Sequence, residues 1–220
     1  MNPDFPEEYT RWQVSYLGHT IFVTHDVLIP RLETEVLIKR ARKILQNTHT
    51  KTILDIGTGS GIIPISLRNY TEWQMYAVDI SPEALLIAEK NFRYNLGEKQ
   101  CTFMESNLLE NIPNSSMRTP LLITANLPYI RNEDWGNMSA DTRYEPQVAL
   151  FWGEKTGFEL YEKLLYELAE RQMDTTILLI EFWYDQLQNA QDEVEKYGWK
   201  SEVFSDYAGI PRFMQINIDI

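Results

Sequence analysis

A glycine-rich loop is the first segment whose residues could bind a small ligand. The run Asp55-Ile56-Gly57-Thr58-Gly59-Ser60-Gly61 follows a predicted strand at residues 52–56 and opens a predicted helix. Glycines let the backbone turn tightly and approach a ligand, and a helix N-terminus offers free N–H groups. The dinucleotide fingerprint G-x-G-x-x-G would need Gly or Ala at position 62, where this chain has Ile62. The loop is therefore predicted to bind a ligand without that fingerprint, or else to form an ordinary tight turn.

An acidic residue ends the next predicted strand. Asp79 closes residues 74–79 and precedes a predicted helix at 81–95. A carboxylate at such a strand tip can accept hydrogen bonds from both ribose hydroxyls of a nucleoside. The alternative is that Asp79 only caps the following helix. The order of strand, glycine loop, helix, strand and acid favours nucleotide-type binding.

A second motif, Asn126-Leu127-Pro128-Tyr129, ends a predicted strand at 121–126. Ligands of open α/β sheets lie outside the carboxyl ends of the strands, so this motif is expected beside the glycine loop. An amide nitrogen is a poor nucleophile, and a site can orient it by accepting its N–H groups. The Asn126 side-chain oxygen and the Leu127 carbonyl are suitable acceptors. Pro128 would stiffen the loop and the Tyr129 ring could pack on a planar group; the alternative is an ordinary proline turn.

The elements that position these motifs alternate between strands and helices. Strands are predicted at 52–56, 74–79, 101–105, 121–126, 175–182, 200–204 and 213–218, and helices at 32–46, 81–95, 158–172 and 186–197, with a further helix from the glycine loop to about residue 69. This alternation predicts a doubly wound, mostly parallel sheet. Two final strands without a helix between them predict one antiparallel insertion. Residues 14–24 predict a hairpin, so we expect an extension at 1–30 and one domain at 31–220.

The composition is that of a globular protein with an acidic balance. The 220 residues carry 32 Asp and Glu against 20 Lys and Arg, a net charge of −12. Proteins that grip phosphate backbones need clustered basic residues, so no stable nucleic-acid binding is expected. The only dense basic run, residues 39–43, is predicted to be a solvated helix face. Residues 111–220 hold 9 basic and 18 acidic residues, a candidate surface for a basic protein partner.

Several classes of site and location are disfavoured. Cys101 is the only cysteine, and the three histidines have no ligand spacing, so no metal site is predicted. The first eight residues have no basic start and no apolar run, which disfavours a signal peptide. No apolar run is long enough to span a membrane. A cytoplasmic location is the expectation.

Taken together, these segments resemble the peptide-chain-release-factor glutamine N5-methyltransferase family (the HemK/PrmC group). The glycine spacing with Asp55 resembles the first motif of class I S-adenosylmethionine methyltransferases, and residues 126–129 resemble the Asn-Pro-Pro-Tyr motif. Further matches lie at residues 28–35, 143–146 and 149–150, at Glu181, and at 206–209 with Arg212. Each segment alone is moderately specific, and their order is highly specific.

The resemblance implies a Rossmann-like fold, a cofactor and a substrate. The fold is a mostly parallel seven-stranded sheet, the cofactor is S-adenosyl-L-methionine, and the substrate is the Gly-Gly-Gln glutamine of a translation release factor. The implied cofactor-binding residues are Asp55, Gly57, Thr58, Gly59, Ser60, Gly61, Asp79, Asn107, Leu108 and Asn126, and the implied catalytic residues are Asn126, Leu127, Pro128 and Tyr129. Arg31, Glu33 and Glu35 would line the substrate entrance, or else form a charge cluster at a helix start.

The chain departs from the family at three places. Leu127 replaces the first Pro of the motif, and it retains the carbonyl through which that residue acts. Asn107-Leu108 stands where the family often has Asp-Trp beside the adenine. Only about fifteen residues precede the hairpin, so the usual N-terminal helical domain is expected to be lacking, and a partner subunit could complete the site.

Two other functions remain open. The same Asn-x-Pro-Tyr loop serves methyltransferases that act on the N6 amino group of adenine in nucleic acid, although the acidic charge disfavours this. The other is a homologue that binds the cofactor and a protein without turnover on its own. Leu127, Leu108 and the short N-terminal segment motivate that alternative.

Overall fold

A seven-stranded sheet forms the centre of the molecule. The computed structural model describes residues 5–49, 52–117, 121–151, 153, 155–172 and 175–219. The strands of the large sheet are β3 (Thr52–Ile56), β4 (Gln74–Asp79), β5 (Thr102–Glu105), β6 (Leu121–Ala125), β7 (Thr176–Glu181), β8 (Lys200–Ser205) and β9 (Pro211–Ile218). Their order is β5-β4-β3-β6-β7-β9-β8. The predicted α/β fold with seven strands is confirmed.

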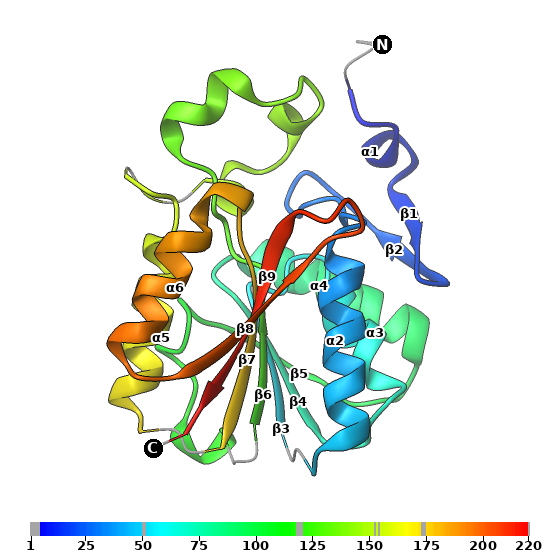
Figure 1. Cartoon of the computed structure of the whole chain (residues 1–220). Helices are drawn as coiled ribbons and strands as arrows, with labels where there is room; N and C mark the ends of the chain where they lie inside the picture. The colour runs from blue at the N-terminus through cyan, green and yellow to red at the C-terminus, as the bar shows by residue number, and fades with distance from the viewer. Residues whose placement is uncertain are drawn as a thin grey trace.

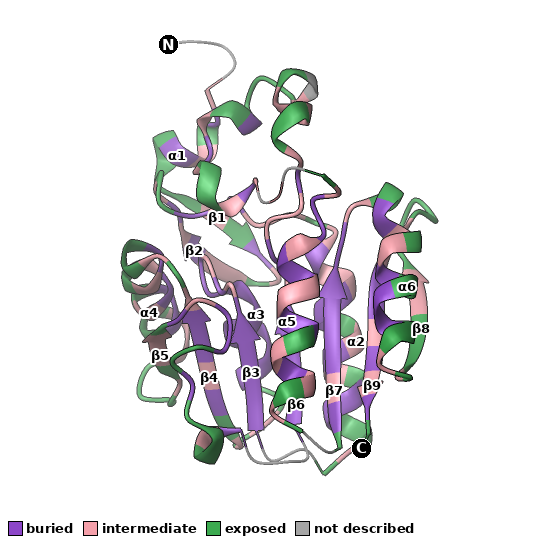
Figure 2. Ribbon diagram, turned by 90° about the vertical axis from the view of Figure 1, so that its left-hand side faces the viewer, coloured by how far each residue is buried: buried purple, intermediate pink, exposed green. Residues whose placement is uncertain are grey.

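The two central strands are buried along their whole length. Every residue of β3 and of β6 is buried, and the two strands pair in parallel. A continuous apolar run is typical of parallel strands covered on both faces. Figure 2 shows this buried centre, with β3, β4 and β7 pointing toward the end of the molecule that carries α1, and Figure 1 shows the green segment that follows β6 at the same end. That end therefore holds the carboxyl ends of the strands, where ligands bind.

One strand runs against the others. Strand β9 pairs antiparallel with both β7 and β8, so it is inserted between them. The pairs β3–β4, β4–β5, β3–β6 and β6–β7 are all parallel. The predicted antiparallel insertion at the end of the chain is confirmed.

Helices cover both faces of the sheet. They are α2 (Thr34–Asn47), α3 (Ile62–Arg68), α4 (Pro82–Leu96), α5 (Glu159–Glu170) and α6 (Leu187–Lys196). Figure 1 shows α2, α3 and α4 on one side of the sheet and α5 and α6 on the other, and a separate apolar cluster lies under each layer. Ser81 caps α4, since its hydroxyl accepts a 3.1 Å hydrogen bond from the Ala84 amide. Among the described residues no helix has both the length and the apolar character needed to cross a bilayer.

A small N-terminal unit packs against α4. It consists of α1 (Glu7–Arg11), which the sequence did not predict, and the predicted hairpin of β1 (Gln13–Tyr16) and β2 (His19–Phe22). The Asn91 side chain pairs with both backbone groups of Phe22, at 2.7 and 2.9 Å, and Asn95 does the same for Thr20. These two amides replace a neighbouring strand and fix the hairpin on α4. The division of the chain at residue 30 stays a prediction.

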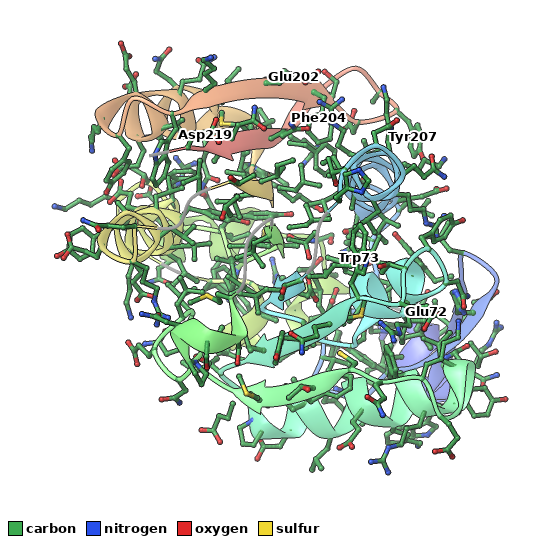
Figure 3. All side chains as sticks on the ribbon, turned by 90° about the horizontal axis from the view of Figure 1, so that it is seen from below. Glu72, Trp73, Glu202, Phe204, Tyr207 and Asp219 are labelled. Atoms are coloured by element: carbon green, nitrogen blue, oxygen red, sulfur yellow. The ribbon has the colours of Figure 1, made fainter. Side chains whose placement is uncertain are left out.

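The basic run on α2 contacts other parts of the chain. Lys39 donates to the Tyr207 hydroxyl, Arg40 to the Glu202 carboxylate and Arg42 to the Ser66 carbonyl. Figure 3 shows Glu202 on β8 and Tyr207 in the turn after it, on the side of the sheet that faces α2. Lys39 and Arg40 thus join α2 to β8 and the turn after it, and Arg42 joins α2 to α3. Lys39 and Lys43 are exposed, as predicted, whereas Arg40 and Arg42 are partly buried.

Candidate active site

The glycine loop is held in shape by close packing. Gly57 and Gly61 have φ angles of +69° and +79°, which side chains rarely adopt. A Cβ atom on Gly57 would lie 2.8 Å from the Leu127 Cδ2 atom, and one on Gly61 would lie 3.1 Å from Ala88. Gly61 is the N-cap of α3, so the free N–H groups of that helix start next to the loop. The glycines thus allow the loop to lie directly on the Asn126–Tyr129 motif and on α4.

Asp79 connects the loop to the start of α4. Its Oδ2 atom accepts a 2.8 Å hydrogen bond from the Gly59 amide, and its Oδ1 atom accepts a 3.0 Å bond from the Ser81 amide. Ser81, and not Asp79, caps the helix. Each carboxylate oxygen accepts more than one hydrogen bond, so Asp79 can also serve ligand hydroxyls. Burial raises the pKa of the Asp79 carboxyl.

Asp55 lies beneath the loop. It is buried, its Oδ1 atom accepts a 2.7 Å hydrogen bond from the Thr124 hydroxyl, and burial raises the pKa of its carboxyl to about 7. The Thr58 hydroxyl is buried close to the same carboxyl and opposes the rise of its pKa. Asp55 and Gly61 do not line the ligand pocket described below, although the sequence predicted them as contacts.

The residues just after β5 line another side of the ligand pocket. Leu108 is buried with a φ angle of +54° and faces the pocket, whose lining also includes Ile80 and Asn107. The Asn107 amide donates a 2.9 Å hydrogen bond to the Glu110 carboxylate. A left-handed Leu is strained, and such strain persists at functional sites where the surroundings enforce it. Ile80 and Leu108 give this end of the pocket two apolar side chains.

The Asn126 carboxamide is held by two buried groups. Its Nδ2 atom donates to the Glu181 Oε2 atom at 2.9 Å and to the Thr34 hydroxyl at 3.1 Å. The Thr34 hydroxyl also donates to Glu181 Oε2 at 3.0 Å. Glu181 is 1% exposed, and its burial raises the pKa of its carboxyl to about 7. Sequence reasoning noted Glu181 only through the family resemblance and gave Thr34 no role.

Leu127 and Tyr129 of the motif are held by contacts with residues of α5 and of the segment after β7. The Leu127 amide donates a 2.9 Å hydrogen bond to the buried Tyr161 hydroxyl, which in turn donates to the Glu181 carbonyl. The Tyr129 carbonyl accepts a 2.8 Å hydrogen bond from the Gln186 side chain. The centre of the Tyr129 ring lies 5.7 Å from the centre of the Trp183 ring. Burial raises the pKa of the Tyr129 hydroxyl, so the ring is neutral. The motif is therefore rigid even though Leu127 replaces the first Pro.

A pocket brings most of the predicted residues together. Of the sequence-predicted site residues, its lining includes Gly57, Thr58, Gly59, Ser60, Asp79, Asn107, Leu108, Asn126, Leu127 and Pro128. Tyr129 lies instead in a second pocket, on the side of Trp183, with a volume of about 380 Å³. Asn126, Leu127 and Pro128 line both pockets. The motif therefore separates a loop-side pocket from a second, adjoining pocket.

The segment before α2 also lines the first pocket, and sequence reasoning had placed only Arg31 of it at the site, through the family resemblance. We call residues 26–31 the strap, because Asp26, Val27, Leu28, Pro30 and Arg31 line this pocket. Three groups hold the strap: the Tyr9 hydroxyl donates to the Val27 carbonyl at 2.8 Å, the Tyr16 hydroxyl donates to the Arg31 carbonyl at 2.9 Å, and Glu145 accepts from the Ile29 amide and pairs with Arg31. No local signal predicts these contacts, because they join residues far apart in sequence.

The charged residues at the start of α2 have different roles. Arg31 lines both pockets, whereas Glu33 and Glu35 line neither. Glu35 pairs with Lys39 at 2.9 Å. Within the described ranges, no group of three or more His, Cys, Asp or Glu side chains could hold a metal ion.

Comparison with known sequences identifies relatives along most of the chain. The chain is 40% identical over 166 residues to the release factor glutamine methyltransferase of Enterococcus faecalis, which covers 74% of this chain and 57% of that protein. It is 34% identical over 211 residues to that of Moorella thermoacetica, covering 94% of this chain and 73% of that protein. The model of the family described as ribosomal protein L11 methyltransferase (PrmA) matches residues 33–147, slightly more than half of the chain.

Solved structures share the fold. The ribosomal protein L11 methylase of Lactobacillus delbrueckii subsp. bulgaricus superposes with a TM-score of 0.64 at 18% identity, over 91% of this chain and 86% of that one. The N-terminal domain of human METTL16, solved with SAH, superposes with a TM-score of 0.62 at 13% identity, over 98% and 90%. These likenesses confirm the methyltransferase fold. Because the similarity to the Moorella enzyme extends over nearly the whole chain, the protein belongs to the release factor glutamine methyltransferase family, and its residues 33–147 carry the methyltransferase core of the PrmA family.

Proposed function

We propose that this chain transfers a methyl group from S-adenosylmethionine to the side-chain nitrogen of the glutamine in the Gly-Gly-Gln motif of a release factor. The observation that carries the proposal is the motif that two adjoining pockets share, residues 126–128. A group-transfer site needs a donor and an acceptor on either side of one set of orienting groups. We further propose residues 31–220 as the methyltransferase domain and residues 1–30 as an extension over its pocket.

The loop-side pocket suits the cofactor. The buried Thr58 side chain lines this pocket beside the Asp55 carboxyl, and its hydroxyl can bond a polar ligand group. We assign the methionine part to residues 57–60 and the ribose to the Asp79 carboxylate. Ile80 and Leu108 offer apolar faces to the adenine, in place of the ring that many relatives carry. When bound, the cofactor supplies an electrophilic methyl group on a sulfonium sulfur.

The acceptor is oriented by groups of the motif. Asn126 commits its Nδ2 atom to Glu181 and Thr34, which leaves its oxygen to accept an N–H of the substrate amide. The Leu127 carbonyl is the second acceptor, and the hydrogen bond of the Leu127 amide to the Tyr161 hydroxyl holds the residue that carries it. Two accepted N–H bonds align the nitrogen lone pair and stabilise the positive charge that develops on it. The new N–C bond uses that lone pair, and one N–H proton then leaves to water.

The second pocket suits a protein loop. Its lining includes Arg31, Ser139, Asp141 and Thr142, which can bond the backbone of an extended peptide, and Trp183 beside Tyr129. The acidic surplus in residues 111–220 favours a basic partner. These features support a release-factor loop as the acceptor.

One experiment tests the proposal. The protein is incubated with S-adenosylmethionine and a release factor, and the Gly-Gly-Gln peptide is mapped by mass. We expect one added methyl group on the glutamine and none on a Gly-Gly-Glu version, whose side chain offers no N–H donor. Cofactor binding by calorimetry without any methylated peptide would overturn the proposal in favour of a binding homologue. Methylation of an adenine-containing oligonucleotide instead would move the substrate to nucleic acid.

A further inference from the structure

An asparagine side chain can work in this site in only one of its two orientations. Its carboxamide has an oxygen end that accepts hydrogen bonds and a nitrogen end that donates them, and the two ends have nearly the same shape. A substrate amide offers N–H donors, so it needs the oxygen end of Asn126. The structure has the nitrogen end turned to Glu181 and Thr34, 2.9 and 3.1 Å away.

We propose that Glu181, assisted by Thr34, is a positioning residue that fixes the Asn126 carboxamide with its oxygen facing the acceptor nitrogen. The inference rests on the proposed function and adds a residue to it. Glu181 lines neither pocket and is 1% exposed, so it acts through Asn126 and does not touch the substrate.

A carboxylate selects one orientation because it cannot donate. With the nitrogen end turned inward, Glu181 Oε2 accepts two bonds, one from Asn126 and one from the Thr34 hydroxyl. With the oxygen end turned inward, two acceptors would face each other in a buried place, and the outward nitrogen would meet the N–H groups of the substrate. A charge-assisted bond is about twice as strong as a neutral one, so the selection is strong.

Glu181 also influences the second acceptor. Its backbone carbonyl accepts the Tyr161 hydroxyl, and the same hydroxyl receives the Leu127 amide at 2.9 Å. The side chain of one residue thus orients Asn126, while its backbone supports the segment that carries the Leu127 carbonyl. The positions of both acceptors are therefore fixed by hydrogen bonds to Glu181, the last residue of the central strand β7.

Glu181→Gln is the first test, because it keeps the size and removes the charge. A glutamine can present either its oxygen or its nitrogen to Asn126, so the selection is lost. We expect kcat for methylation of the release factor to fall 10- to 100-fold, with the cofactor Kd unchanged within threefold. Glu193→Gln is the matched control: Glu193 is a buried carboxylate on α6 that pairs with Lys196, and this variant should keep wild-type activity.

A double-variant comparison separates positioning from a structural role. Glu181→Gln should have no further effect on kcat in an Asn126→Ala background, because the group it orients is gone. If the two losses multiply instead, Glu181 does not act through Asn126 and the inference is overturned. Wild-type kcat in Glu181→Gln overturns it as well.

A second pair of variants covers a failure of Glu181→Gln to fold. Thr34→Val removes the hydroxyl that bonds both partners, and Thr34→Ser restores it; we expect the first to lose activity and the second to recover most of it. Equal activity of the pair overturns the inference. Absence of methylation by the wild-type protein, in contrast, overturns the proposed function itself, so the two failures are distinguishable.

Discussion

The backbone amide of Gly59 donates a 2.8 Å hydrogen bond to the Oδ2 atom of Asp79, which stands at the end of the neighbouring strand. This bond joins the glycine loop to the tip of β4, so one carboxylate both shapes the loop and faces the ligand pocket. The two features that suggested a nucleotide-type ligand from sequence are therefore parts of one structure. Removal of either should affect the other.

Asp79→Ala tests this connection. The variant leaves the Gly59 and Ser81 amides without their acceptor, and a hydrogen bond to a charged group contributes about 1.5–3 kcal/mol. We expect S-adenosylmethionine affinity, measured by calorimetry, to fall by about 10- to 100-fold. Glu83→Ala is the control, because this exposed acid at the start of α4 does not line the pocket. Equal affinities of the two variants would contradict the assignment of Asp79.

Gly57→Ala tests the close packing between the loop and the catalytic motif. A Cβ atom would meet Leu127 Cδ2 at 2.8 Å, and a left-handed conformation costs a residue other than glycine about 1–2 kcal/mol. We expect a loss of stability in urea unfolding together with a loss of methylation, because Leu127 must move. Gly198→Ala has the same φ angle of +69° and open space around it. It should therefore lose stability by the backbone cost alone and remain active.

Much of the fold could be predicted because its signals are local. Strands β3 and β4 have the predicted bounds, since each is an apolar or mixed run between clear loop residues. The predicted helix at 81–95 agrees with α4 for the same reason, because Ser81 followed by Pro82 is a local start signal. Residues 131–149 were not predicted, because the short 3-10 helices η2 (Asn132–Asn137), η3 (Thr142–Tyr144) and η4 (Gln147–Ala149) have no apolar period to recognise.

Some site residues could likewise be predicted from local sequence signals, and others could not. The glycine loop, Asp79 and the Asn126 motif are visible in sequence, because each lies just after a strand. Thr34 and Glu181 are 147 residues apart and meet at Asn126 only in the folded chain. Such contacts depend on the order of strands in the sheet, where β6 and β7 are neighbours. No spacing rule could assign them.

Glu145→Ala tests the strap over the pocket. The Glu145 side chain is 1% exposed, accepts the Ile29 amide at 3.1 Å and pairs with Arg31. Removal of one partner of a buried ion pair costs about 3–5 kcal/mol, and less here because Arg31 is partly exposed. We expect a lower melting temperature and a cofactor affinity reduced by about tenfold. The control Glu133→Ala removes an exposed acid from the same region, and a similar loss of affinity in that variant would show that the strap is not responsible.

Asp55→Asn tests the buried carboxyl beneath the loop. Its pKa is raised from 3.8 to about 7 by burial, with the nearby Asp79 charge acting in the same direction. The folded state therefore binds a proton that the unfolded state releases, and the stability from this proton is lost as pH rises from about 4 to 7. Between pH 5 and 7 the loss is about 2 kcal/mol. Glu181, whose pKa is also raised to about 7, adds a similar loss of its own. Urea unfolding should therefore show a loss between pH 5 and 7 that is smaller in Asp55→Asn by about 2 kcal/mol than in the wild type and in Asp192→Asn, an exposed control.

The last prediction concerns the pH dependence of methylation, which we expect to follow the charge of Glu181. Burial raises the pKa of its carboxyl to about 7, with Glu33 raising it further and Thr34, Arg212 and Arg31 opposing the shift. The buried hydroxyls of Tyr16, Tyr129 and Tyr161 also surround it, and burial raises their pKa values, so they stay neutral between pH 6 and 9.

Only the ionised Glu181 carboxylate is purely an acceptor for the hydrogen bonds from Asn126 and Thr34. We therefore expect kcat to rise with pH through about 7 and to level off at higher pH. The substrate amide does not titrate in this range, so it adds no further change to the profile of kcat against pH. In Glu181→Gln the rise should disappear and the rate should stay low at every pH, because no charge remains to select the orientation of Asn126. Glu193→Gln should keep the wild-type profile. If kcat of Glu181→Gln still rises with pH, another group causes the rise. The charge of Glu181 would then not control the orientation of Asn126.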